Sequence, residues 1–183
     1  MTLQIRDATT NDIPSCMALD HDYETTHVWQ MHVQPETMGR GVVFRSERLP
    51  RPMPVTYPAD SRRLHLALEA AQCFLVAINR DEDGASETLG YLTMRADPVH
   101  QSGWVQDLVI SRPYRRSKIG TRLFKVATRW AVEQNLDQLV FEIQTKNHPA
   151  ITFCGHHGLA FCGYHDQYFR NGDIAIFFGK SIR

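Results

Sequence analysis

The sequence predicts one α+β domain, a mixed sheet with helices on its faces. The chain has 183 residues, enough for a single core of ordinary size. Along the sequence, segments of alternating or β-branched apolar residues are interspersed with segments whose apolar residues recur at helical spacing. No internal repeat appears, which excludes a solenoid or a propeller. We therefore expect one domain over residues 1–183.

The expected strands are short runs rich in β-branched and aromatic residues, several of them bounded by turn-forming residues. The last two are joined through Asn171-Gly172, a typical hairpin turn. The runs are Leu3–Ala8, Cys73–Asn79, Leu89–Arg95, Trp104–Ile110, Leu139–Ile143, Phe161–Tyr168 and Ile174–Lys180.

The expected helices follow the 3.6-residue period. Thr9, Thr10 and Asn11 are N-cap residue types, and a short apolar periodic segment follows them. The other helices are expected over residues 22–32, 64–71 and 120–134, and from Pro149 to near Gly158.

Residues 35–58 hold five of the nine prolines. Proline lacks a backbone donor, so this segment is restricted to edge strands and loops. It also contains apolar residues such as Val42, Phe44 and Met53, too many for a free linker. We interpret it as an ordered, Pro-rich flap inserted into the domain.

Composition excludes several functional classes. Twenty basic and twenty acidic residues balance, so the chain lacks the positive excess of a general nucleic-acid binder. The longest apolar run, Cys73–Ile78, is far shorter than a membrane span, and the first residues contain no signal-peptide core. The four cysteines are scattered and form no C-x-x-C pair, which favours a reducing cytoplasm.

Charge is nevertheless concentrated in one place. Between Asp107 and Glu133, 25 residues contain no acid and seven of the 20 basic residues. A charge run of this kind is commonly a solvated helix face. Here, however, it covers the junction between an expected strand end and an expected helix start, where free N–H groups and the helix dipole favour phosphate. We therefore expect one acidic ligand at this junction.

The junction reads Ser111-Arg-Pro-Tyr-Arg-Arg-Ser-Lys-Ile-Gly-Thr121 and contains neither a nucleoside-triphosphate loop nor a dinucleotide fingerprint. It resembles the acetyl-CoA motif [RQ]-x-x-G-x-[GA] of the GNAT acetyltransferases, with Arg115 first and Gly120 last. Lys118 stands where that family usually has its first glycine.

A downstream segment strengthens the resemblance. Asn147, Ala150, Phe153 and Gly158 match, in order, the family pattern N-x-x-A-x-x-[FL]-Y-x-x-x-G-F. Cys154 replaces the tyrosine of that pattern, which is the family's usual candidate acid. A narrower likeness to streptothricin-type acetyltransferases lies in Glu142-x-Gln144-x-x-Asn147, in Gly163 and in the segment Asp173–Phe178.

The resemblance implies a mixed, mostly antiparallel sheet of about seven strands and acetyl-CoA as cosubstrate, with no metal. It places the pyrophosphate on the turn Arg115, Arg116, Ser117, Lys118, Ile119, Gly120 and Thr121. It also implies that Asn147 contacts the pantetheine arm, and that main-chain N–H groups of Leu108, Val109 and Ile110 lie by the thioester. The acceptor would be an amine of a small molecule or a peptide.

A protonated amine is not a nucleophile, so acetyl transfer needs a group that removes its proton. Asp107 and Glu142 are candidates, although each is equally explained as a strand carboxylate facing solvent. Cys154 is a candidate acid for the leaving thiol, although a buried cysteine is commonly inert. Tyr164 or Tyr168 would supply a hydroxyl instead.

Three alternatives remain open from the sequence. Cys154, His156, His157, Cys162 and His165 suggest a metal site, but their spacing fits no standard zinc pattern. A ping-pong route through Cys154 lacks an adjacent base. A GNAT-like domain that binds acyl-CoA without turnover is the alternative function. We expect no nucleic-acid or membrane partner, and the sequence does not distinguish a monomer from a homodimer.

Overall fold

The computed structural model describes residues 2–36, 39–57, 60–70, 72–80 and 86–183. The strands are β1 (Thr2–Asp7), β2 (Tyr23–Glu36), β3 (Gly39–Val55), β4 (Cys73–Arg80), β5 (Ser86–Asp97), β6 (Ser102–Ile110), β7 (Gln138–Gln144), β8 (Ala160–His165) and β9 (Ala175–Ser181). The helices are α1 (Ile13–Met17), α2 (Ser61–Glu69), α3 (Ile119–Glu133) and α4 (His148–His156), with short 3-10 helices η1 (Thr10–Asp12) and η2 (Arg112–Tyr114).

Among these residues, seven strands form one sheet in the order β1-β4-β5-β6-β7-β9-β8, and β2 and β3 form a second, two-stranded sheet. Strand β4 pairs antiparallel with β1 and β5, β5 with β6 and β8 with β9, whereas β6 and β7 run parallel, so the predicted mixed α+β architecture is confirmed. The chain divides into two compact units: residues 1–21, 58–141 and 180–183 form the first, and residues 22–57 and 142–179 the second.

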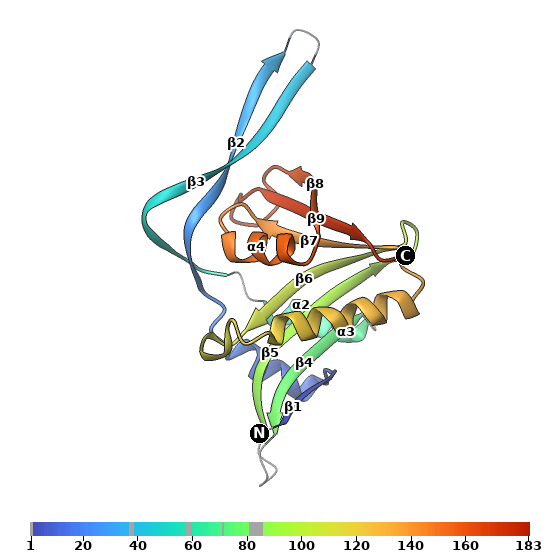
Figure 1. The fold of residues 1–183 in the computed structure, drawn as a ribbon. Helices are drawn as coiled ribbons and strands as arrows, with labels where there is room; N and C mark the ends of the chain where they lie inside the picture. The colour runs from blue at the N-terminus through green and yellow to red at the C-terminus, as the bar shows by residue number, and fades with distance from the viewer. Residues whose placement is uncertain (1, 37–38, 58–59, 71, 81–85) are drawn as a thin grey trace. The chain divides into compact units, whose positions relative to one another are not determined.

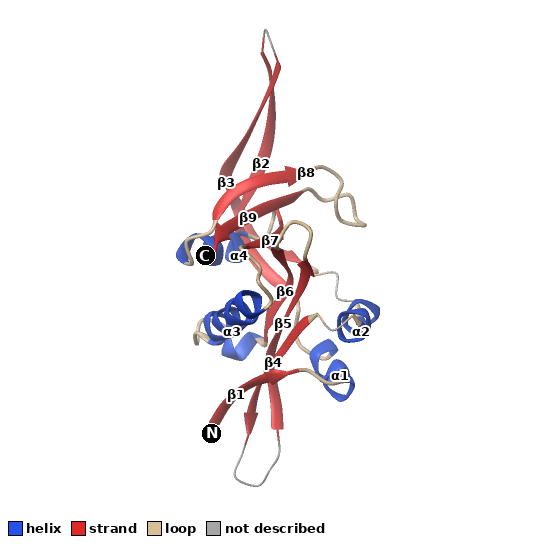
Figure 2. Cartoon of the chain, turned by 90° about the vertical axis from the view of Figure 1, so that its right-hand side faces the viewer, coloured by secondary structure: helices blue, strands red, loops and turns tan. Residues whose placement is uncertain are grey.

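The first unit is built around β4 and β5. Helix α3 covers one face of these strands, and α1 and α2 cover the other (Figures 1 and 2). Coverage on both faces explains why seven consecutive residues of β4, from Cys73 to Asn79, are buried. On α3 the buried stripe includes Leu123, Ala127 and Ala131, as the helical period predicts. None of the described helices is long and apolar enough to cross a membrane.

The helix expected over residues 22–32 is wrong, because this segment is the first part of strand β2 (Figure 2). It contains Thr25, Thr26 and Val28 beside Tyr23 and Trp29, residue types that favour a strand. The partner that completes its hydrogen bonds is β3, in a register from Tyr23↔Val55 to Glu36↔Gly39. Long-range pairing therefore outweighs the weak helical spacing.

The Pro-rich segment lies mostly in β3. Within the described part of the chain, β3 pairs with β2 alone, so Pro50, Pro52 and Pro54 occur in an edge strand, where a missing donor is tolerated. Within the second unit, the ring of Trp29 lies 6.4 Å from that of Phe44 and 5.5 Å from that of Phe178 on β9. These aromatic contacts fix the base of the β2–β3 ribbon.

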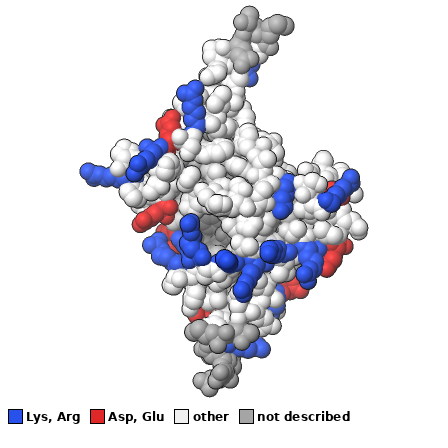
Figure 3. All heavy atoms as spheres, in the orientation of Figure 1, with Lys and Arg blue, Asp and Glu red and all other residues white. Residues whose placement is uncertain are grey.

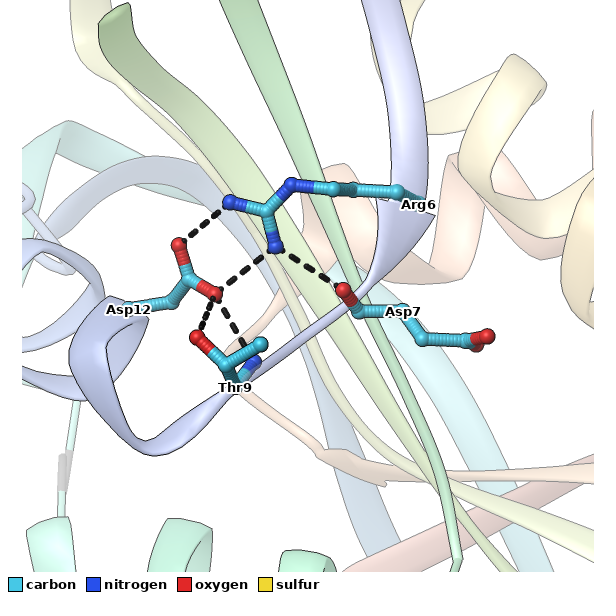
Figure 4. A network of polar contacts seen from close by, with 4 residues as sticks. All are labelled: Arg6, Asp7, Thr9 and Asp12. Carbon is cyan, nitrogen blue, oxygen red and sulfur yellow. Dashed lines mark hydrogen bonds and ion pairs between the residues drawn. The ribbon is translucent and has the colours of Figure 1, made fainter.

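Asp12 organises the start of the first unit (Figure 4). Its carboxylate accepts two hydrogen bonds from the Arg6 guanidinium, each 2.8 Å long. The same carboxylate accepts from the N–H and the hydroxyl of Thr9, also at 2.8 Å, and so caps η1. Chiefly because of the Arg6 bonds, the pKa of Asp12 is lowered from 3.8 to about 2.

This shift predicts a pH-dependent stability. Asp12→Asn should lower the free energy of unfolding at pH 7 by about 2 kcal/mol, since a pKa unit corresponds to roughly 1.4 kcal/mol. The folded-state pKa is the lower one, so the difference from wild type is complete above pH 3.8 and disappears as pH falls toward about 2. Urea unfolding across pH measures it. Asp7→Asn is the control, because the Asp7 carboxylate points away from Arg6 (Figure 4).

Candidate active site

The turn between β6 and α3 is held by backbone hydrogen bonds within the first unit. The Ser111 N–H donates to the Leu89 carbonyl at 2.8 Å, which ties the end of β6 to β5. The Tyr114 N–H then donates to the Ser111 carbonyl at 2.9 Å and closes η2. Helix α3 begins at Ile119, and the N–H groups of a first helical turn have no acceptor within the helix. The turn therefore ends at a helix N-terminus, a kind of position that favours anions.

Arg115 braces this turn. Its Nε donates to the Ile110 carbonyl at 3.0 Å, and its Nη2 donates to the Asp20 carbonyl at 2.6 Å. Nearby, Arg112 pairs with the Asp20 carboxylate at 2.7 Å. The Arg115 guanidinium thus holds two main-chain segments together, a role that the motif alone did not indicate.

Two residues of the turn have left-handed backbones. Arg116 has φ 69°, and Lys118, the N-cap of α3, has φ 66° and ψ 8°. In tight turns, left-handed residues can bring successive N–H groups to one side, an arrangement that favours anions. Arg116, Ser117 and Lys118 are exposed, whereas Ile119 is buried and Gly120 and Thr121 are half-buried. The position that is glycine in the family motif is therefore left-handed here despite its lysine side chain.

Basic side chains extend from this turn along α3. Lys118, Arg122, Lys125 and Arg129 are exposed and follow one another at spacings of four, three and four residues, which places them on one helix face. Figure 3 shows Lys and Arg side chains gathered over α3. The local positive field predicted from the acid-free segment is therefore present on this face.

Lys118→Gly separates backbone strain from charge. Glycine adopts the left-handed conformation without strain, so the free energy of unfolding should rise by up to about 1 kcal/mol. Loss of the ammonium should weaken coenzyme A binding about five-fold, since a partly screened contact to phosphate is worth roughly 1 kcal/mol. Calorimetry measures the affinity, with Lys125→Ala as the control for net charge. Tighter binding by the glycine variant would contradict a phosphate contact.

Asp107 on β6 has a fully buried side chain. It forms an ion pair with Arg63 of α2, and its Oδ2 accepts a hydrogen bond of 2.6 Å from the Thr93 hydroxyl on β5. The strand continues through Leu108 and Ile110, which are half-buried, and Val109, which is buried. Gly90 of β5 permits this approach, because a Cβ there would lie 2.5 Å from the Val109 carbonyl oxygen.

In the second unit, Asn147 caps α4 by accepting a hydrogen bond of 3.1 Å from the Ala150 N–H. Asp173 contacts two side chains of the same unit: Gln144 donates a hydrogen bond to it at 3.1 Å, and Lys146 forms an ion pair with it at 2.6 Å. Tyr23 donates to the Gln144 side chain at 3.2 Å. Gln144 and Asp173, both from the narrower sequence likeness, thus belong to one polar network.

The other two candidates differ in exposure. Glu142 on β7 is half-buried. Cys154, inside α4, has no exposed surface, and burial raises the pKa of its thiol to about 12. The thiol is therefore protonated at neutral pH. Among the described residues, no group of three or more His, Cys, Asp or Glu side chains is arranged to hold a metal ion.

The sequence found the turn but missed several partners. Arg63, Thr93, Tyr23 and Asp20 carry no motif, and each contacts a candidate residue or its network from a distant part of the sequence. Such contacts are identified only when the folded structure shows which helices and strands lie together.

Comparisons with known proteins identify the family of the chain. Residues 43–159 match the model of the acetyltransferase (GNAT) family, which is more than half of the chain. N-alpha-acetyltransferase 30 of Homo sapiens is 27% identical over 107 residues, 57% of this chain and 28% of that protein. The homologous protein of Xenopus laevis is also 27% identical, over 37% of its length. The chain thus matches well under half of these relatives' length.

Solved structures share the fold. A nourseothricin acetyltransferase superposes with a TM-score of 0.81 at 20% identity, covering 100% of both chains. A structure described as a streptothricin acetyltransferase of Bacillus anthracis, in complex with acetyl coenzyme A, gives 0.75 at 18% identity and covers 98% of this chain and 99% of the other. With the motif-bearing turn at the start of α3 and the family match over residues 43–159, the chain belongs to the acetyltransferase (GNAT) family.

Proposed function

We propose that this enzyme transfers the acetyl group of acetyl-CoA directly to an amine in a ternary complex. The observation that carries the proposal is the turn from Arg115 to Thr121, where left-handed Arg116 and Lys118 lead into the N-terminus of α3. A diphosphate needs this combination of converging N–H groups and nearby cations.

The residues of the chain fit the parts of acetyl-CoA by their chemistry. The turn residues would hold the pyrophosphate, and the exposed Arg122 adds charge one helical turn further on. Main-chain N–H groups of Leu108–Ile110 would donate to the thioester carbonyl, and the remaining amide of Asn147 to the pantetheine arm. Bound acetyl-CoA supplies an activated acetyl thioester, so the chain needs no acyl-enzyme and no metal for this reaction.

Of the two candidate bases, Asp107 and Glu142, we assign proton removal to Glu142. Both oxygens of Asp107 already accept hydrogen bonds, from Arg63 and from Thr93, and its side chain has no exposed surface. A base must reach the proton of the incoming ammonium. The half-buried Glu142 meets this requirement better than a fully enclosed carboxylate does.

Cys154 is predicted to be neither acetylated nor essential. A thiol with a pKa of about 12 is not a thiolate at neutral pH and is a weak acid for a departing thiolate. Cys154→Ala should lower turnover by less than about 10-fold, below the roughly 10²–10⁴ that a general acid contributes. Initial rates with both substrates varied should give intersecting lines. Parallel lines, with an acetyl mass increment on Cys154, would establish a ping-pong route instead.

We propose that the β2–β3 ribbon selects the acceptor amine. The ribbon contains most of the Pro-rich segment, and β2 and the first residues of β3 lie before residue 43, where the family match begins. The structural neighbours are described as acetyltransferases of nourseothricin and streptothricin, whereas the sequence relatives are described as N-alpha-acetyltransferases. Both acceptor classes therefore belong in the test.

A screen of amines tests the function. The wild-type protein is incubated with acetyl-CoA and a panel of amine-bearing antibiotics, other small amines and peptide N-terminal amines, and free thiol release is measured. Amine-dependent release is the expected result. Tight coenzyme A binding by calorimetry without release for any amine would favour a non-catalytic acyl-CoA-binding domain.

A further inference from the structure

The buried carboxylate of Asp107 is held from two other elements. Arg63 reaches it from α2, 44 positions earlier in the chain, and Thr93 reaches it from β5. The Asp107 side chain is 0% exposed, whereas the Arg63 side chain is 32% exposed. A buried carboxylate is strongly unfavourable without hydrogen-bond partners. Asp107 therefore depends on Arg63 and Thr93 to remain in place.

These contacts coincide with an irregularity in the sheet. The β5–β6 register pairs Thr93 with Asp107 but Met94 with Val105, so Gln106 is an extra residue in β6. An extra residue of this kind is a β-bulge, which bends its strand and changes the direction of the residues beyond it. The Thr93–Asp107 hydrogen bond lies on the pair directly beside the bulge.

The bulge separates two parts of β6 with different neighbours. The parallel pairing with β7 involves Ser102–Val105, before the bulge. Beyond the bulge, residues 108–110 continue alongside β5 and lead into the turn that Arg115 braces. This second part begins at Asp107, directly after the extra residue Gln106, so the bulge sets its direction.

We infer that Arg63 and Thr93 are positioning residues, which act through Asp107 to hold the bulged part of β6 in the geometry that Leu108–Ile110 need for the thioester. The inference rests on the proposed function. An ion pair that served stability alone would be replaceable by apolar residues with little loss. A positioning pair would instead show its effect on turnover and on the backbone of β6.

The experiment compares Arg63→Met with Arg62→Met, a matched change on the neighbouring, exposed residue of α2. We expect Arg63→Met to lower kcat about 10-fold or more, because small displacements of a binding segment are costly. Its dissociation constant for coenzyme A should change less than about three-fold, since the cations of the turn and the Arg115–Asp20 hydrogen bond remain. Arg63→Lys should recover part of kcat, and Arg62→Met should match the wild type.

Two further measurements separate positioning from other roles. In Asp107→Asn, the acid limb of the pH–rate profile should remain, whereas its loss would make Asp107 the base and overturn the inference. Hydrogen exchange of the peptide containing Leu108–Ile110 should be faster in Arg63→Met and in the milder, nearly isosteric Thr93→Val, but unchanged in Arg62→Met. Unchanged exchange in both of the first two variants would also overturn it.

The same experiment distinguishes this inference from the proposed function. If the wild type releases no thiol with any amine, the proposed function fails, and hydrogen exchange alone decides whether Arg63 and Thr93 hold β6. If the wild type is active and Arg63→Met behaves as Arg62→Met does, only the inference fails.

Discussion

Glu142→Gln is expected to lower kcat by about 10²-fold or more, the lower end of what a general base contributes. A primary amine has a pKa near 10 and is almost fully protonated at neutral pH, so its proton must be accepted before the nitrogen can attack. Glutamine has nearly the same shape as glutamate but cannot accept that proton. The KM for acetyl-CoA should change little, because Glu142 is not part of the turn that is proposed to bind the diphosphate. Thiol release at saturating substrates measures the effect.

The pH dependence makes this prediction specific. As the pH approaches the pKa of the amine, more of the acceptor is already deprotonated and the need for a base declines. The deficit of Glu142→Gln should therefore shrink between neutral pH and about pH 9.5. Glu133→Gln, the same change at an exposed residue of α3, is the control. A variant that keeps more than a third of wild-type turnover at pH 7 would show that the base lies elsewhere.

The double change Arg115→Ala with Arg116→Ala should weaken coenzyme A binding about 30-fold or more, since hydrogen bonds to charged groups contribute roughly 1.5–3 kcal/mol each. The affinity that remains should also depend less on salt, because fewer cations face the phosphates. Calorimetry at two ionic strengths measures both effects. Unchanged affinity would exclude this turn as the pyrophosphate site.

The single variants distinguish the role of Arg115 from that of Arg116. Arg115 donates to the carbonyls of Ile110 and Asp20, so Arg115→Ala should lower the melting temperature as well as the affinity. Arg116 is exposed, so Arg116→Ala should lower the affinity alone. Arg129→Ala, also exposed on α3, controls for the loss of one positive charge.

Local sequence was sufficient for the features that depend on neighbouring residues. The buried stripe of α3 follows from apolar residues three and four positions apart, and the start of α4 from Pro149, a residue suited to the first turn. The acid-free segment and the motif at Arg115–Gly120 located the expected cofactor turn. Each of these signals lies in one continuous stretch of the sequence and depends on no contact with a distant segment.

Sequence reasoning failed where pairing partners are distant. Residues 22–32 carry a weak helical spacing, but their hydrogen bonds are completed by β3, so the strand is decided by a partner that the local pattern does not contain. The role of Asp107 changed for the same reason. Its alternation with apolar residues allowed an exposed carboxylate or a base, and neither description includes an arginine 44 positions away.

The sequence by itself thus determined the family, the turn expected to bind acetyl-CoA and most of the helices and strands, because those properties depend on short patterns. The tertiary structure alone decided that Lys118 takes a left-handed backbone, that Cys154 is enclosed and that Asp107 is held by Arg63 and Thr93. Burial and ion pairing arise from segments brought together by folding. The pKa of a thiol and the environment of a carboxylate depend on those surroundings rather than on residue type.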